Sequence, residues 1–300
     1  AKWIISAFAD EHSPDLAGQI AALRSFELSN IELRFLEGKN VADLTPQEAK
    51  TAKEMLDAGG IRVSAIGSPL GKINLADDFV AHMEKARGVL ETANILETDK
   101  IRMFSFYLHA GKSREACRSE VIDKLGAMLD LAEVFGVKLC HENEAAIYGE
   151  TPECRDLLDA FGGRLRAVFD MGNFTLEGYN PWPDGYGLLK EYIEYFHIKD
   201  VINATGELVP AGYGDGKIDK LVSMIDRNVV LTLEPHLAVF DAYAQIDNTE
   251  MKHKFTYKDS NEAFDAAVKA LKDILINIKL LIILIYIIII NKNRLKNVKL

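Results

Sequence analysis

Short β-rich runs alternate with longer stretches of helical periodicity along most of this 300-residue sequence. We expect eight such strands, each followed by helix, and regular alternation of this kind predicts a parallel sheet. The predicted strands are residues 3–8, 30–35, 62–66, 100–107, 137–142, 165–170, 195–199 and 229–234.

The intervening stretches carry helix signals. Thr45-Pro46-Gln47-Glu48 combines a capping box with proline at the first helical position. The other predicted helices are residues 14–26, 78–93, 113–135, 151–161, 218–225 and 261–274. No G-x-G-x-x-G follows the first strand and no P-loop is present, which disfavours an open nucleotide-binding sheet. We therefore predict an α/β fold, a single-domain (β/α)8 TIM barrel over residues 1–273, since such a barrel needs about 250 residues.

Residues 274–300 form an apolar and then basic tail that we expect to lie outside the barrel. Residues 280–290 are an unbroken apolar run, which is shorter than the roughly 20 residues that span a bilayer. An aberrant C-terminus is the first interpretation of this tail. Packing against the protein or a partner is the second, and a membrane anchor is the third.

Charge and cysteine content narrow the function classes. The formal net charge is −10 and the pI is about 5.3, and no basic cluster precedes residue 291, so we expect no nucleic-acid partner. The odd number of cysteines, three without a C-x-x-C pair, argues against a disulfide framework. No basic n-region opens the sequence, and we expect a cytoplasmic protein with a small-molecule substrate. A homo-oligomer is left open.

Four runs end in a side chain that can bind a metal: Glu142, Asp170, His197 and Glu234, each about one βα unit from the next. Residues at the carboxyl ends of barrel strands converge on the mouth, where barrel enzymes keep their active sites. Three carboxylates and one imidazole suit a divalent ion, with Mn²⁺ or Mg²⁺ first and Zn²⁺ or Co²⁺ as further options.

Strand parity adds candidates for substrate binding. Side chains alternate faces along a strand, so Lys199 shares a face with His197, His236 with Glu234, and Glu144 with Glu142. Lys199 and His236 either contact substrate hydroxyls or fill the cavity wall. Glu144 is an alternative to Glu142 as ligand.

Two further features have more than one interpretation. Glu32 and Arg34 end the second strand, and we expect them to pair with each other. The glycine-rich loop at residues 212–216 is either a tight turn into the next helix or a phosphate cradle built from backbone amides.

The order and spacing of several motifs resemble the xylose isomerase-like barrel superfamily, which includes sugar-phosphate isomerases and epimerases, over roughly residues 3–273. The motifs are His-Glu-Asn-Glu at 141–144, Phe-Asp-Met-Gly-Asn at 169–173, His-Ile-Lys-Asp at 197–200, Gly-Tyr-Gly-Asp-Gly at 212–216 and Leu-Glu-Pro-His at 233–236.

The resemblance implies a single-metal site in which Glu142 and Glu234 are also the acid–base pair. Asn173 stands where the family has a substrate-contacting histidine, and Asn203 stands near the place of a family arginine. These departures argue against tagatose-type epimerisation of a free ketose. We retain Asn173 as a substrate-binding candidate.

The implied chemistry is proton abstraction next to a carbonyl of a carbohydrate, through an enediolate. Returning the proton gives epimerisation or isomerisation. Loss of a β-substituent gives a lyase or dehydratase, acting for example on a keto-inositol or a 3-keto-glycoside. The alternative from a different class of function is a non-catalytic barrel that acts as a binding subunit. Endonuclease IV-like repair is disfavoured, because its histidine-rich three-zinc site is not matched at Gly67, Ser68 and Asn173.

Overall fold

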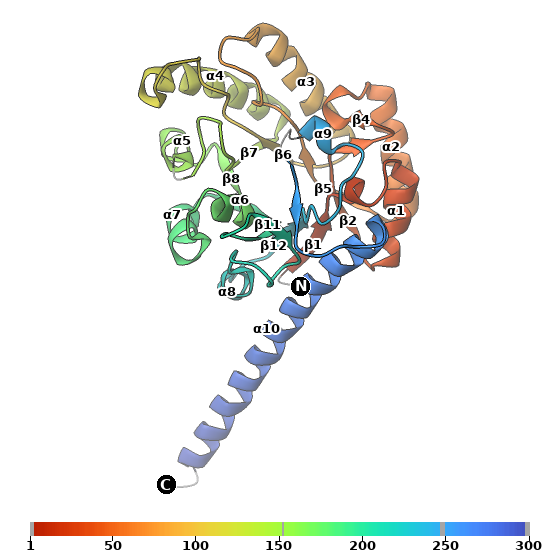
Figure 1. Ribbon diagram of the computed structural model, residues 1–300, viewed down its shortest axis with the longest axis vertical. Helices are drawn as coiled ribbons and strands as arrows, with labels where there is room; N and C mark the ends of the chain where they lie inside the picture. Colours follow the sequence, from red (N-terminus) through yellow and green to blue (C-terminus); the bar gives the residue numbers. More distant parts are fainter. Residues whose placement is uncertain (1–2, 152, 247–249, 298–300) are drawn as a thin grey trace.

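The computed structural model describes residues 3–151, 153–246 and 250–297. Eight parallel strands form one sheet in the order β1-β12-β9-β8-β7-β6-β5-β2, and β1 also lies against β2, so the sheet curves into a nearly closed barrel (Figure 1). The predicted TIM barrel is confirmed. Its strands are β1 (Trp3–Ala7), β2 (Asn30–Leu33), β5 (Arg62–Gly67), β6 (Lys100–Met103), β7 (Lys138–Glu142), β8 (Arg166–Asp170), β9 (Ile193–Ile198) and β12 (Val229–Leu233).

Helices surround the barrel and connect its strands (Figure 1). The predicted capping box is present, because the Thr45 side chain accepts from the Glu48 N–H while the Glu48 carboxylate accepts from the Thr45 N–H. The helices are α1 (Leu16–Ser25), α2 (Pro46–Gly59), α3 (Phe79–Ile95), α4 (Arg114–Phe135), α5 (Cys154–Ala160), α6 (Met171–Leu176), α7 (Tyr186–Leu189), α8 (Ile218–Ser223), α9 (Tyr243–Ile246) and α10 (Ser260–Asn297).

The fourth predicted strand, residues 100–107, is shorter in the structure and ends at Met103. Beyond it the backbone N–H groups of Phe104 and Phe106 donate to the carbonyls of Leu70 and Gly71 in the loop after β5. Phe106 has a φ of 73°, which no strand residue adopts. The apolar run therefore continues as a buried loop at the barrel mouth.

Short elements build up the mouth beyond the barrel strands. The small strands β10 (Asp200–Ile202), β11 (Glu207–Val209) and β13 (Lys252–His253) form a sheet of their own. A hairpin of β3 (Phe35–Leu36) and β4 (Lys39–Asn40) follows β2, and the 3-10 helix η1 (Ala9–Glu11) follows β1. All these segments follow the carboxyl end of a barrel strand, so they add side chains to one end of the barrel.

The C-terminal helix α10 runs on past residue 274, where the sequence led us to expect its end. Phe264, Val268 and Leu271 are buried against the barrel, whereas every residue from 280 to 290 is 36–65% exposed. Figure 1 shows this part of the helix projecting away from the barrel. No glycine or proline interrupts these residues, so nothing in the local sequence stops the helix. Among the described helices, α10 is the one whose length and composition would allow it to cross a membrane.

We predict that deleting residues 280–300 leaves the barrel folded and its metal content and turnover intact, because the exposed apolar residues do not contact the barrel mouth. The truncated protein should be more soluble and less associated, since a large exposed apolar surface promotes association. Light scattering after gel filtration would measure this. Loss of activity on truncation would contradict the prediction.

Candidate active site at the barrel mouth

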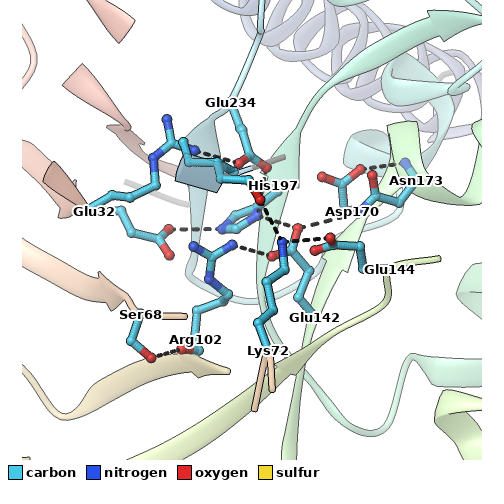
Figure 2. Close-up of polar contacts among 12 residues, drawn as sticks. Glu32, Ser68, Lys72, Arg102, Glu142, Glu144, Asp170, Asn173, His197 and Glu234 are labelled. Atoms are coloured by element: carbon cyan, nitrogen blue, oxygen red, sulfur yellow. Dashed lines mark hydrogen bonds and ion pairs between the residues drawn. The ribbon is translucent and has the colours of Figure 1, made fainter. Parts of the chain in front are cut away.

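Four predicted residues meet at the mouth of the barrel. Glu142, Asp170, His197 and Glu234 each offer a ligand atom, and these atoms all lie within 4.8 Å of one another. All four side chains are buried, and Figure 2 shows them pointing toward a common centre. The strand ends of β7, β8, β9 and β12 place them there.

Two members of the cluster, Glu142 and Glu234, line a cavity of about 470 Å³. A cavity of this size falls within the range of small-molecule sites. All four predicted substrate-binding residues, Lys199, His236, Asn173 and Glu144, line it. Lys72, Arg102, Tyr107, Tyr243 and Lys252 also line it, and the sequence analysis did not single them out.

The His197 ring lies at the centre of the cluster. Its Nδ1 atom is 3.1 Å from Glu142 Oε1 and 3.2 Å from Glu234 Oε2. Its Nε2 atom is 3.1 Å from Glu32 Oε2, and Glu32 Oε1 accepts a hydrogen bond from the Tyr195 hydroxyl at 2.8 Å. Burial disfavours the charged imidazole, but the three glutamates outweigh it and raise the pKa of His197.

The expected pairing of Glu32 with Arg34 is wrong. Arg34 instead contacts Asp10 and Glu11 of η1 and, through NH1 at 2.9 Å, Glu234 Oε1. Both side chains point into the barrel. Glu32 there meets two residues of β9, and Arg34 meets residues that follow β1 and β12, rather than each other. Strand parity indicated the face, but the partners depend on barrel closure.

Charge pairing keeps the two cluster glutamates ionised. Burial raises the pKa of Glu142, but His197 and Arg102 outweigh burial and bring it well below its usual range. Lys199 and His197 do the same for Glu234. Both residues are therefore carboxylates at neutral pH, the form that binds a metal or accepts a proton.

The ionised form of Asp170 is less favourable than that of the two glutamates. Burial, which Lys199 only partly offsets, together with the nearby Glu142 and Glu234, raises its pKa to about 7. Its Oδ2 atom pairs with Lys199 Nζ at 2.9 Å, while Oδ1 accepts a hydrogen bond from the Asn173 N–H. A divalent cation would relieve this crowding of carboxylates, and the donor set of three carboxylates and one imidazole fits such an ion.

Asn143 is a buried residue that the sequence analysis passed over. Its side-chain amide makes two hydrogen bonds to the backbone of Asp170, and its own carbonyl accepts from Asn173 Nδ2 at 2.8 Å. Asn173 Nδ2 also lies 3.5 Å from Glu142 Oε1. The two asparagines therefore connect the end of β7 to the end of β8. In the sequence, the only indication that Asn143 belongs to the site was its position directly after Glu142.

Glu144 lies apart from the cluster. Its carboxylate pairs with Lys72 at 2.7 Å, and it does not belong to the four-residue group, so it does not take the place of Glu142.

His236 adopts a left-handed backbone with a φ of 48°, and its N–H donates to Glu11 Oε2. This conformation keeps the buried imidazole beside Glu234, with His236 Nε2 3.6 Å from Glu234 Oε1. A non-glycine residue held at positive φ is uncommon and often marks a functional site.

The glycine-rich loop at residues 212–216 is a turn and not a phosphate cradle. The N–H groups of Gly212, Gly214 and Gly216 all donate to the buried carboxylate of Asp200, which follows β9. A Cβ atom at Gly214 would lie 2.4 Å from Asp200 Oδ1, so glycine is needed for this close approach. The amides are thus already occupied by a carboxylate of the protein itself.

A search of known protein families matches residues 20–274 to the xylose isomerase-like TIM barrel. The chain belongs to this family. No curated protein sequence matches it significantly.

Solved structures with this xylose isomerase-like fold cover nearly the whole chain at low sequence identity. The probable 3-DHS dehydratase AsbF from Bacillus anthracis has a TM-score of 0.69 and 19% identity, covering 91% of this chain and 99% of its own. A D-psicose 3-epimerase with D-tagatose from Clostridium cellulolyticum H10 has a TM-score of 0.68 and 12% identity, covering 90% and 97%. The IOLI protein with a bound zinc atom has a TM-score of 0.66 and 17% identity, covering 91% and 98%. At these identities the likeness shows the shared fold.

We predict that Asp170→Asn weakens Mn²⁺ binding at least tenfold, because it removes one charged oxygen ligand from the cluster. Glu144→Gln, which alters a carboxylate in the same cavity but outside the cluster, should bind Mn²⁺ as the unchanged protein does. Isothermal titration of metal-free protein would measure both. Equal effects of the two substitutions would contradict this ligand assignment.

We also predict that Asp200→Ala destabilises the fold by roughly 2–4 kcal/mol, because it leaves several buried N–H groups without an acceptor. Thermal unfolding should then shift down by about 5–10 °C. Asp219→Ala, exposed in the first turn of α8 just after this loop, is the matched control and should change little. An Asp200→Ala protein that melts like the control would show that the loop does not depend on this carboxylate.

Proposed function

We propose that this protein is a divalent-metal-dependent isomerase or epimerase that acts on a small carbohydrate by proton transfer at a carbon next to a carbonyl. One observation carries the proposal: two buried, ionised glutamates, from β7 and from the end of β12, both contact Nδ1 of one buried imidazole and line the same cavity. Such a pair can serve a carbon atom from two sides. Neighbouring folds that include a D-psicose 3-epimerase support this reading.

Glu142, Asp170, His197 and Glu234 would hold the metal ion, with Mn²⁺ or Mg²⁺ as our first choice. When bound, the ion acts as a Lewis acid that polarises the substrate carbonyl and its neighbouring hydroxyl. A neighbouring structure with zinc and another with magnesium support a divalent ion of some kind.

The two glutamates would move the proton. One carboxylate abstracts it from the carbon, and the other, after taking a proton from a substrate hydroxyl, donates that proton back to carbon. Return to the opposite face of the same carbon inverts its configuration, and return to the adjacent carbon gives the isomer. The cavity wall excludes bulk water around both groups, which strengthens their charges in the site.

Lys199 and His236 would orient the substrate by hydrogen bonds to its hydroxyl groups. Lys199 Nζ already lies within 2.9 Å of Asp170 and 3.5 Å of Glu234, so it sits between the cluster and the cavity. His236 lies on the Glu234 side of the same cavity.

Three buried free cysteines are consistent with our further proposal of a reducing, cytoplasmic location.

Elimination of a β-substituent is a second candidate reaction for the same site. The observation in its favour is Asn173, whose side-chain amide is taken up by Asn143 and Glu142 rather than directed at a substrate hydroxyl. The first neighbour given above is itself a probable dehydratase. A panel of ketoses, keto-inositols and 3-keto-glycosides with Mn²⁺ in deuterated water would separate the outcomes by NMR. Exchange with an inverted or isomerised product supports the first reaction, and loss of water from a keto-inositol or of the aglycone from a 3-keto-glycoside supports the second.

We predict that Glu234→Gln and Glu142→Gln each lower turnover by about 10²–10⁴-fold, the range typical of general acid–base catalysis. The amide keeps one oxygen for the metal but cannot accept the proton. Exchange of the substrate C–H with solvent should differ between the two variants, since each removes the group on one side of the carbon. Glu54→Gln, on the exposed face of α2, is the control. Wild-type turnover by either metal-loaded cluster variant would rule out the two-glutamate mechanism.

A further inference from the structure

Each cluster glutamate directs one carboxylate oxygen at His197 and the other at an arginine. Glu142 Oε1 lies 3.1 Å from His197 Nδ1, while its Oε2 accepts from Arg102 NH1 at 2.7 Å. Glu234 Oε2 lies 3.2 Å from the same Nδ1, while its Oε1 accepts from Arg34 NH1 at 2.9 Å. Figure 2 shows the Arg102 guanidinium beside the His197 ring and directed at Glu142. The two glutamates therefore follow the same arrangement at one nitrogen of the imidazole.

One aromatic ring lies against both arginines and the histidine. The Arg34 guanidinium carbon is 4.1 Å from the centre of the Phe8 ring, and that of Arg102 is 5.6 Å from it. The same ring meets the His197 ring edge to face at 5.1 Å. Phe8 is fully buried, so it fixes the planes of the guanidinium groups by packing.

Glycine at the end of β5 makes room for this arrangement. A Cβ atom at Gly67 would lie 2.5 Å from Phe8 Cε1 and 3.4 Å from Arg102 NH2. A rigid buried ring cannot move aside as a flexible side-chain end can, so any larger residue here would displace Phe8 and, through it, the arginines.

We propose that Arg34 and Arg102 are positioning residues that hold one oxygen of Glu234 and of Glu142 away from the metal position, so that each glutamate presents a single oxygen to it. The proposal rests on the function proposed above, because that function makes Glu142 and Glu234 the residues that transfer the proton. A carboxylate with both oxygens on a metal has neither oxygen free of it, whereas an oxygen that accepts one hydrogen bond from arginine keeps a second lone pair that can take the proton. This division therefore keeps both glutamates competent for proton transfer.

The two arginines hold their glutamates in different ways. Arg34 also donates from Nε and NH2 to both oxygens of Asp10, at 2.9 and 3.2 Å, so its planar fork bridges two carboxylates. Among the described residues, Arg102 makes one hydrogen bond to a carboxylate, through NH1 to Glu142. A lysine ammonium can replace a single donor but not a planar fork. We therefore expect a lysine to perform the positioning role of Arg102 but not that of Arg34.

The experiment compares Arg102→Met, Arg102→Lys, Arg34→Lys and the surface control Arg118→Met in the full-length protein loaded with Mn²⁺. Electron paramagnetic resonance of the bound Mn²⁺ reports its ligand field without any substrate. Arg102→Met should change this spectrum and, on a substrate found in the panel, lower kcat by about 10–100-fold, as loss of a group that orients a metal ligand does. Arg102→Lys should restore both properties, Arg34→Lys should change both, and Arg118→Met should change neither.

A wild-type spectrum and wild-type kcat in Arg102→Met would overturn the proposal, even if Arg34→Lys does not fold. Gly67→Ala offers a second route, because it substitutes neither arginine and should still alter the Mn²⁺ spectrum by displacing Phe8 and, through it, the two guanidinium groups. A wild-type spectrum in that variant would likewise count against the arrangement. If the spectra change as expected but no carbohydrate is turned over, the positioning roles stand and the proposed function fails.

Discussion

Ion pairs among buried side chains hold the mouth of this barrel together. Arg34 pairs with Asp10 and Glu234, and Arg102 pairs with Glu142, all out of contact with bulk solvent. Taking such charges out of water is costly, and the cost is recovered only when every charge has well-placed partners. Removing one partner would leave a buried charge uncompensated, so the cluster geometry depends on the whole set. The need of these carboxylates for positive charge also explains why a divalent cation suits the site.

The alternation of strands and helices was enough to predict the barrel, because a parallel sheet of eight βα units has few other ways to bury both faces. The same reasoning located the cluster. Glu142, Asp170, His197 and Glu234 each follow an apolar strand, and the carboxyl ends of parallel strands meet at one end of a barrel. What the sequence predicted, then, was the position of each residue along its own strand and the face that it occupies.

Partners across the barrel could not be predicted in this way. Glu32 and Arg34 have opposite charges and share a face, which suggested a local pair, yet closure of the sheet brings Tyr195 and His197 to Glu32 and brings Glu234 to Arg34. Arg102 lies inside a strand and carries no motif that points to a site. The loop at residues 212–216 shows the same limit, because its amides were recognised but their acceptor, Asp200, became evident only in the fold.

Anomalous diffraction at the manganese edge, from crystals grown with Mn²⁺, tests the central claim most directly. The account predicts one strong peak at the barrel mouth, about 2.0–2.6 Å from single oxygens of Glu142, Asp170 and Glu234 and from His197 Nδ1. Glu142 Oε2 should remain on Arg102. A peak bound elsewhere, or a protein without a peak at saturating Mn²⁺, would contradict the assignment of this cluster as the catalytic centre.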